Sequence, residues 1–159
     1  MENNFLNGSI DENLVDIAEY YFDIDNTTNK IYKHLTIDSL ENKFVYFDEN
    51  VEYISLYPYL EVKEDYTKFS VSVSFDLQSY TENKLPLLIY SIGDFYQAVP
   101  LISLQNKNLN TGELEHFANR IMISTTKSYK GEKLKIYFRN SSKDRMMFDN
   151  VKVLIKASK

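Results

Sequence analysis

The sequence predicts an all-β protein, a β-sandwich or barrel of about eight strands in a single domain. Three observations predict this class: runs of alternating apolar and polar residues, turn-forming clusters spaced at about 8–15 residues, and no long helical pattern between them. The chain has 159 residues, of which 43% are hydrophobic, and this is enough for one hydrophobic core. With 4 Gly and 3 Pro it shows no linker, so we treat residues 1–159 as one domain.

The first segment, residues 1–19, is predicted to be an N-terminal extension before a sandwich core over residues 20–156. Ser9–Glu12 matches a capping box, in which a serine precedes a glutamate by three residues. The apolar residues that follow lie at helical spacing: Leu14, Ile17, Ala18 and Tyr21. This spacing favours a short helix or a turn. Beyond it, β-branched and aromatic residues dominate, and strands are expected.

The strand patterns then follow in order along the chain. Apolar residues occupy alternate positions from Phe69 to Leu77, and serines and Asp76 occupy the positions between them, as in a strand with one buried face. Residues 85–92 are apolar on both faces, which predicts a central strand covered on each side. Alternation also predicts strands within 31–38, 117–124, 133–139 and 151–156. Turn signals separate these runs at 81–84, 92–94, 106–112, 130–132 and 140–144.

Composition excludes several classes of function. The absence of Cys excludes a disulfide scaffold, thiolate catalysis and Cys-based zinc sites. A pI of about 5.1 and a net charge of −5 argue against nucleic acid as a partner, because phosphate binding needs a basic surface. The longest apolar run, Leu85–Tyr90, is too short to insert into a membrane, since a spanning helix needs about 20 residues. We therefore expect a soluble chain.

The N-terminus lacks the basic and apolar regions of a secretory signal. The chain is therefore expected to act where it is made, in the cytoplasm or a virion, or to be a domain of a longer exported protein at the cell surface.

The last third of the chain has a recognisable order. The strand Lys133–Asn140 ends in an amide and is followed by a short polar turn. The closing strand, Met146–Ile155, carries an aromatic-Asp-x-Val-x-Val pattern. Upstream lie Glu52–Ser55, the strand residues Val71–Val73 and the apolar run Leu87–Tyr90. Over roughly residues 44–156 this order resembles the galactose-binding-domain-like jelly rolls, a group of β-sandwiches that includes many bacterial carbohydrate-binding modules.

This resemblance implies a single jelly-roll β-sandwich of about eight antiparallel strands, of bacterial or phage origin. Sugar-binding members of the family usually present Trp; this chain has none, and Phe117 occupies a stretch where Trp is common in such modules. Family members often hold a structural calcium ion between the first strand and an acidic residue near the last. The resemblance implies Asp23, Asp25 and Asp149 as its ligands here, with a turn-capping role for Asp149 as the alternative. No other cofactor is expected.

Catalytic residues are not predicted. Neither His34 nor His116 lies in a nucleophile motif, and both are expected at the surface. A carboxylate-based glycoside hydrolase is the enzyme alternative, because acidic residues cluster along the chain. The candidate groups are Asp23 with Asp25, Asp48 with Glu49 and Glu52, and Glu61 with Glu64 and Asp65.

The leading prediction is a non-catalytic, carbohydrate-binding-like recognition module. Flat aromatic rings stack on the C–H face of a sugar, and amide or guanidinium groups bind its hydroxyls. The expected ligand-binding residues are Tyr80, Tyr96, Arg120, Tyr137, Arg139 and Asn140. The alternative is a structural or interaction subunit, a surface or virion component whose partner is another protein subunit or a second copy in a homo-oligomer. Tyr is also enriched at protein interfaces.

Charge is unevenly distributed between the two halves of the chain. Residues 1–80 carry 5 basic and 16 acidic side chains, and residues 81–159 carry 13 and 7, which gives net charges of −11 and +6. In a jelly roll each sheet takes strands from both halves, so we expect much of this charge to pair across strands. The outward row Lys133, Lys135, Tyr137 and Arg139 is the basic stripe to inspect.

Overall fold

The computed structural model describes residues 13–22, 35–37, 45–47, 52–79, 85–104, 114–140 and 146–159. These residues form strands and one short 3-10 helix. The elements are β1 (Val15–Phe22), β2 (Leu35–Ile37), β3 (Val45–Phe47), β4 (Tyr53–Glu61), β5 (Lys68–Ser79), β6 (Leu87–Ile92), β7 (Phe95–Pro100), η2 (Leu101–Leu104), β8 (Leu114–Ser124), β9 (Lys133–Arg139) and β10 (Met146–Ser158). In this part of the chain no helix is long and apolar enough to span a membrane.

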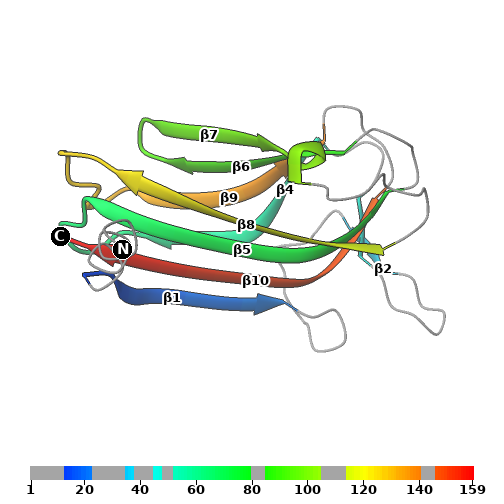
Figure 1. Ribbon diagram of the computed structural model, residues 1–159, viewed down its shortest axis with the longest axis horizontal. Coiled ribbons are helices and arrows are strands. Elements are labelled where there is room, and N and C mark those ends of the chain that lie inside the picture. Colours follow the sequence, from blue (N-terminus) through cyan, green and yellow to red (C-terminus); the bar gives the residue numbers. More distant parts are fainter. Residues whose placement is uncertain are drawn as a thin grey trace, which may run out of the picture.

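The strands form two antiparallel sheets packed face to face. The six-stranded sheet has the order β2-β3-β10-β5-β8, and β1 also pairs with β10. The four-stranded sheet has the order β4-β9-β6-β7. Figure 1 shows β8, β5, β10 and β1 side by side in one layer, with β6, β7 and β9 in the other. The two sheets confirm the all-β sandwich that the sequence predicts.

Aromatic side chains fill the core between the sheets. Phe75 of β5 meets Phe138 of β9 edge to face, with ring centroids 5.0 Å apart, and so joins the two sheets. Phe75 also stacks on Phe117 of β8 at 5.6 Å, and Phe138 contacts Phe148 of β10 at 5.8 Å. All four rings are fully buried or nearly so. Edge-to-face and offset stacked pairs stabilise such a core beyond the area that they bury.

The alternating patterns at 69–77, 117–124, 133–139 and 151–156 form strands as the sequence predicts, and the turns expected at 92–94 and 130–132 are present. The turns expected at 81–84 and 106–112, and most of the turn at 140–144 and of the strand at 31–38, lie outside the described residues. β5 buries Phe69, Val71, Val73, Phe75 and Leu77 and places its serines on the other face. Gly93 and Gly131 lie in turns with φ of +55° and +86°, in the left-handed region that glycine adopts without a steric penalty. β6 is an interior strand, and Ile89, on its outward face, is as fully buried as its inward neighbours.

The N-terminal helix expected around residues 14–21 is wrong for residues 15–22, which form strand β1. β1 pairs with β10 from Val15, opposite Ala157, to Phe22, opposite Val151. The sheet therefore includes residues that the sequence placed in the extension. A register shift between Asp16 and Ala18 explains the misleading pattern, because the extra residue puts Ile17 and Ala18 both against the core. The capping-box residues Ser9–Glu12 lie outside the described residues.

The two oppositely charged halves of the chain meet across strands. Lys156 Nζ lies 3.8 Å from Asp16 Oδ1, and Arg139 Nε lies 3.3 Å from Glu52 Oε1. Lys133, at the other end of β9, pairs in register with Glu61. Hydrogen bonding and charge from Lys63 lower the pKa of Glu61, and Lys133 lowers it further. Acidic residues therefore flank the basic stripe at both ends, and it is not a bare cationic face.

Candidate functional site

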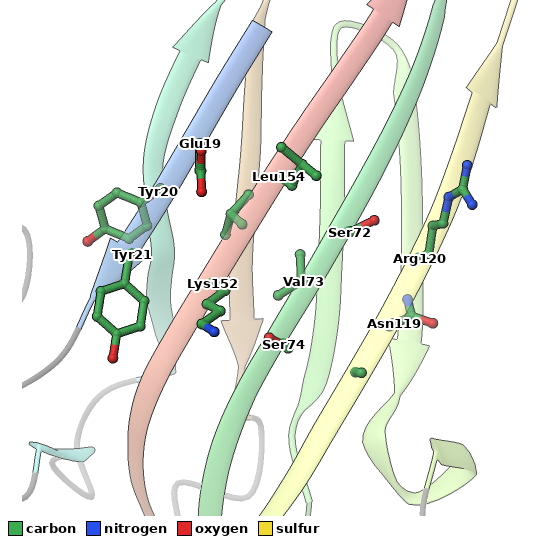
Figure 2. Close-up of a pocket in the computed structure, with 12 residues that line it drawn as sticks. Glu19, Tyr20, Tyr21, Ser72, Val73, Ser74, Asn119, Arg120, Lys152 and Leu154 are labelled. Atoms are coloured by element: carbon green, nitrogen blue, oxygen red, sulfur yellow. The ribbon is translucent and has the colours of Figure 1, made fainter. Parts of the chain in front are cut away.

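A groove of about 660 Å³ crosses the outer face of the six-stranded sheet. Residues of β1, β10, β5 and β8 line it, and Figure 2 shows these strands in that order across the site. The register places Glu19, Leu154, Ser72 and Arg120 in one row across the four strands, and Tyr21, Lys152, Ser74 and Ala118 in the next. The groove is thus built on strands, which hold their side chains more rigidly than loops do.

The groove exists because the outward side chains of β5 are small. Ser72 and Ser74 form a low floor along the middle of the sheet, and the next outward serine, Ser70, is buried and accepts a hydrogen bond from Arg120. On one side the floor is bounded by the longer side chains of Lys152 and Leu154. Arg120 bounds it on the other side. Two serines between long side chains give the middle of the groove a polar floor.

Tyr21 forms an aromatic wall on the β1 side of the groove. Its side chain is 53% exposed, and Lys152 Nζ lies 5.8 Å from the ring centroid, in cation–π range. The Tyr21 hydroxyl donates a hydrogen bond of 3.4 Å to Asn150 Oδ1. Figure 2 shows Tyr21 and Lys152 on the opposite side of β5 from Arg120. The ring is therefore held at the rim with a large part of its surface open to solvent.

Arg120 forms the opposite wall. Its Nε donates to Ser70 Oγ at 2.9 Å, and one terminal nitrogen lies 3.8 Å from the Met122 sulfur. Ser70 is itself buried, so the guanidinium is tied to a fixed point of the sheet. The planar guanidinium carries five N–H donors, which suits it to bind pairs of neighbouring oxygen atoms.

A chain of polar contacts crosses the sheet at the Tyr21 end of the groove. Asp76 of β5 accepts a hydrogen bond from Asn150 Nδ2 at 2.8 Å and lies 2.8 Å from His116 Nδ1. Asn150 in turn accepts the hydrogen bond from Tyr21. Asn150 has a φ of +52° and lies where the β10–β5 register shifts. The chain therefore links β1, β10, β5 and β8 and positions the aromatic wall.

The outer face of the four-stranded sheet carries a second cluster of exposed aromatic residues. We call Tyr53, Tyr96 and Tyr137 the tyrosine platform. Tyr53 and Tyr96 are 55% and 56% exposed, and the rings of Tyr53 and Tyr137 lie 6.1 Å apart. The Arg139 guanidinium carbon lies 5.9 Å from the Tyr53 ring centroid, and its Nε donates to Glu52. Burial raises the pKa of Tyr137, and the nearby Tyr96 and Tyr53 raise it further.

The predicted ligand-binding residues are divided between the two faces. Arg120 lies in the groove, and Tyr96, Tyr137 and Arg139 lie together on the other sheet. Asn140 is only 1% exposed, so the structure does not bring its side chain to the surface as the prediction requires; its backbone N–H donates to the Glu52 carbonyl. Tyr80 lies outside the described residues.

Two of the three predicted calcium ligands, Asp23 and Asp25, lie outside the described residues. The first and last strands are adjacent, as the prediction assumed: β1 ends at Phe22 opposite Val151. Asp149 is half-buried and pairs in register with Asp76. Within the described part of the chain, no group of three or more His, Asp or Glu side chains converges as a metal site. The calcium site stays a prediction.

Sequence reasoning missed Tyr21, the exposed aromatic residue of the groove, because it was interpreted as the last apolar residue of a helical pattern and not as an outward residue of a strand. The pairing of β1 with β10 is what places it beside Lys152. The run of alternate serines from Ser70 to Ser74 was a usable signal. Three outward serines on a central strand leave a trench wherever the flanking strands carry longer side chains.

Comparison with protein-family models and with curated proteins finds no match. Among solved structures, the chain is similar to the CBM22-2 xylan-binding domain from Paenibacillus barcinonensis Xyn10C, with 12% identity, 84% of this chain and 97% of that chain covered, and a TM-score of 0.47. It is also similar to a carbohydrate-binding module, CBM6cm-2, from Cellvibrio mixtus lichenase 5A in complex with cellotriose (6% identity; 87% and 97% covered; TM-score 0.41).

A third similar structure is a cyclase from Fischerella sp. TAU in complex with 4-(1H-Indol-3-yl)butan-2-one, with 9% identity, 92% of this chain and 90% of that chain covered, and a TM-score of 0.43. The similar structures thus include carbohydrate-binding modules, the class of protein that the sequence resembles.

Proposed function

We propose that this protein is a non-catalytic carbohydrate-recognition module and that the serine-floored groove binds a glycan chain. The observation that carries the proposal is the arrangement of Tyr21 and Arg120 on opposite walls of a polar trench. A pyranose has apolar C–H faces and hydroxyls around its edge. It therefore needs a flat ring on one side and hydrogen-bonding groups on the others, and binding sites commonly combine the two.

Each wall has a distinct role in this proposal. The Tyr21 ring stacks on one sugar face, and its cation–π contact with Lys152 fixes its tilt. The Arg120 guanidinium donates to hydroxyls or to the ring oxygen across the groove. The hydroxyls of Ser72 and Ser74 both donate and accept hydrogen bonds, so the floor binds the remaining edge of the sugar. Tyr21 is on β1 and Arg120 is on β8, three strand spacings or about 14 Å away, so a glycan chain that contacts both crosses the strands.

The groove favours binding over hydrolysis. Glycoside hydrolases generally use two carboxyl groups that flank the scissile bond. Among the described residues that line the groove, Glu19 supplies the single carboxylate. The acidic residues Glu61, Glu64 and Asp65, proposed for the hydrolase alternative, are exposed, and Glu61 and Glu64 pair with Lys63 and Lys159. Because the site has one aromatic wall and is open to solvent, we expect weak binding, with a dissociation constant on the order of 0.1 mM, which corresponds to about 5.5 kcal/mol.

A glycan array followed by titration calorimetry tests the proposal. The calorimetric titrations use xylan oligosaccharides, cellotriose and the glycans that bind on the array. Tyr21→Ala is expected to weaken binding of the groove ligand by more than tenfold. Tyr59→Ala is the matched control, because Tyr59 is similarly exposed and Lys133 Nζ lies 4.8 Å from its ring centroid, but it lies on the other sheet. No binding by the wild-type protein, with or without calcium, would overturn the proposal.

A further inference from the structure

The tyrosine platform lies beside a covered apolar residue of the same outer face, and the rings of Tyr53 and Tyr137 are inclined to each other by 59°. Ile89 of β6 points to this outer face, since it pairs in register with Tyr137 and Ala98, yet none of its surface is exposed. Ile89 is absent from the core between the sheets. Its burial on the outside therefore requires cover by side chains of its own face, and Tyr137 lies directly beside it.

The three rings follow a diagonal across the sheet. Tyr53 of β4 pairs with Arg139, Tyr137 lies two residues earlier on β9, and Tyr96 of β7 lies opposite Ser91 of β6. Strand spacing of about 4.8 Å and a rise of about 3.4 Å per residue put the Cα atoms of Tyr53 and Tyr96 roughly 20 Å apart. That diagonal is long enough for an oligosaccharide of several residues.

We propose that the tyrosine platform is a second glycan-binding surface, which takes the face of a neutral polysaccharide and makes this one domain bivalent. This inference rests on the proposed function, because it assigns the same ligand class to a second surface. The rings stack on successive sugars, and the Arg139–Glu52 pair at one end presents N–H donors and carboxylate acceptors to the hydroxyls between them.

A sugar fits the platform better than a second protein does. Tyr53 and Tyr96 are each slightly more than half exposed. A tyrosine side chain has about 200 Å² of surface, so the platform offers about 250 Å² of exposed ring. A stable protein interface buries about 800 Å² on each partner. Ile89, the apolar residue that a partner protein would otherwise bury, is already covered.

The charges at the platform indicate a neutral ligand. Arg139 lies 3.3 Å from Glu52, and this pair brings no net charge to the Tyr53 end. The next charged side chain beside the platform in the strand register is Lys135, which lies opposite Ser91. Of the described cations, Lys135 alone would then attract an acidic polysaccharide to the platform, and one cation is too little to select for it.

The platform and the groove lie on opposite outer faces, because each is on the solvent side of its own sheet. The buried core separates them, so a chain bound in one does not block the other. A domain with two such sites can bridge two polysaccharide chains, or bind one surface with an avidity greater than either site provides.

The test compares four proteins: wild type, Tyr53→Ala/Tyr96→Ala, Tyr21→Ala/Arg120→Ala, and the combination of all four changes. Binding to insoluble xylan and to cellulose is measured by depletion, and bridging of soluble xylan is measured by light scattering. All four changed side chains are exposed, and circular dichroism with a thermal melt verifies the fold. We expect each double variant to keep part of the polysaccharide binding of wild type and the combined variant to lose this binding. We expect only the wild-type protein to bridge soluble xylan, because bridging needs both sites.

The possible failures are distinguishable. If Tyr53→Ala/Tyr96→Ala binds and bridges like wild type while the groove variant loses binding, the platform is overturned and the proposed function stands. If wild type binds neither polysaccharide and no array glycan, both are overturned. If size-exclusion chromatography with light scattering shows a dimer that Tyr53→Ala/Tyr96→Ala converts to a monomer, the platform is a protein interface and the inference is wrong.

Discussion

Asn150 Nδ2 donates a hydrogen bond of 2.8 Å to Asp76 Oδ2, although the two residues are 74 positions apart in the chain. The same Asn150 amide accepts the hydrogen bond of Tyr21, so one side chain connects the aromatic wall of the groove to the central strand of its sheet. The φ of Asn150, +52°, is in the left-handed region, which Asn tolerates better than most residues. Backbone geometry and side-chain chemistry both favour an asparagine here.

Replacement of Asn150 separates these two contributions. Asn150→Gly keeps the backbone conformation but removes both hydrogen bonds, and we expect it to lower the free energy of unfolding by about 1–2 kcal/mol. Asn150→Val adds the strain of a β-branched residue at positive φ, a further cost of about 1–2 kcal/mol. Urea denaturation of the two variants measures the difference. Equal stability would mean that the positive φ is not maintained in solution.

Asp76→Ala tests whether the polar chain positions Tyr21. This change removes the acceptor for Asn150 and His116 but leaves the Tyr21 ring and the groove floor in place. We expect groove-ligand affinity to fall several-fold, with less effect than Tyr21→Ala, because the ring loses its orientation and keeps its surface. Calorimetry measures the affinity, and Asp76→Asn should restore part of it by keeping an oxygen acceptor. An unchanged affinity for Asp76→Ala would show that Tyr21 is positioned without this chain.

A bulky residue on the groove floor should block binding without unfolding the protein. Ser72 is half-buried on the outward face, between Leu154 and Arg120, so Ser72→Phe fills the trench where a sugar would lie. We expect it to abolish binding of the groove ligand and to change the free energy of unfolding by less than about 1 kcal/mol. Ser124→Phe, at the exposed end of β8, is the control for an added ring. Full binding by Ser72→Phe would place the ligand elsewhere.

The burial of Ile89 on an outward face predicts a large loss of stability when its side chain is shortened. Because Ile89 is fully buried, Ile89→Ala should lower the free energy of unfolding by about 2–4 kcal/mol, as for a core position. Lys135→Ala, at an exposed outward position of the neighbouring strand, should change it by less than about 0.5 kcal/mol. Guanidinium denaturation compares the two. Similar small losses for both would contradict the burial of Ile89 on this outer face.

The burial of Tyr90 predicts that the folded protein loses stability at high pH. Burial raises its pKa from 10.0 to about 12, although the hydrogen bond with Asn119 acts in the opposite direction. The folded protein therefore holds this proton more tightly than the unfolded chain does. Its contribution is complete below pH 10 and is lost as the pH rises from 10 to about 12, by up to about 3 kcal/mol.

The comparison with Tyr90→Phe isolates this effect. At pH 8 the variant should be less stable than wild type by about 1 kcal/mol, because it lacks the 2.9 Å hydrogen bond between Asn119 Nδ2 and the Tyr90 hydroxyl. By pH 11 the difference should disappear or reverse, since phenylalanine has no proton to lose. Denaturant melts at pH 8, 10 and 11 measure it. A constant difference would contradict the raised pKa of Tyr90.

Much of the fold could be predicted from the sequence because the strands that build the core alternate cleanly. β5, β8, β9 and β10 each place an apolar row on one face, and the structure packs those rows together. β1 could not be predicted in the same way. The register shift between Asp16 and Ala18 breaks its alternation, and the resulting pattern also matches a helix.

The candidate site was less predictable, since it depends on which strands become neighbours. Arg120 and Tyr21 are 99 residues apart in the sequence, and only the order β1-β10-β5-β8 places them across one groove. Tyr96, Tyr137 and Arg139 were predicted as outward or loop residues, but sequence patterns could not show that they share a sheet opposite Arg120. A strand pattern indicates which face a residue occupies and does not indicate its cross-strand neighbour.

The central claim is that the serine-floored groove binds a glycan between Tyr21 and Arg120. Amide chemical-shift mapping by NMR, with titration of xylan oligosaccharides, cellotriose and the best array glycan, tests it most directly. We expect the largest groove shifts to fall on β1, β5, β8 and β10 around Tyr21, Ser72 and Arg120, and we expect Ser72→Phe to remove them. Shifts confined to other surfaces, or none with any of these glycans, would contradict it.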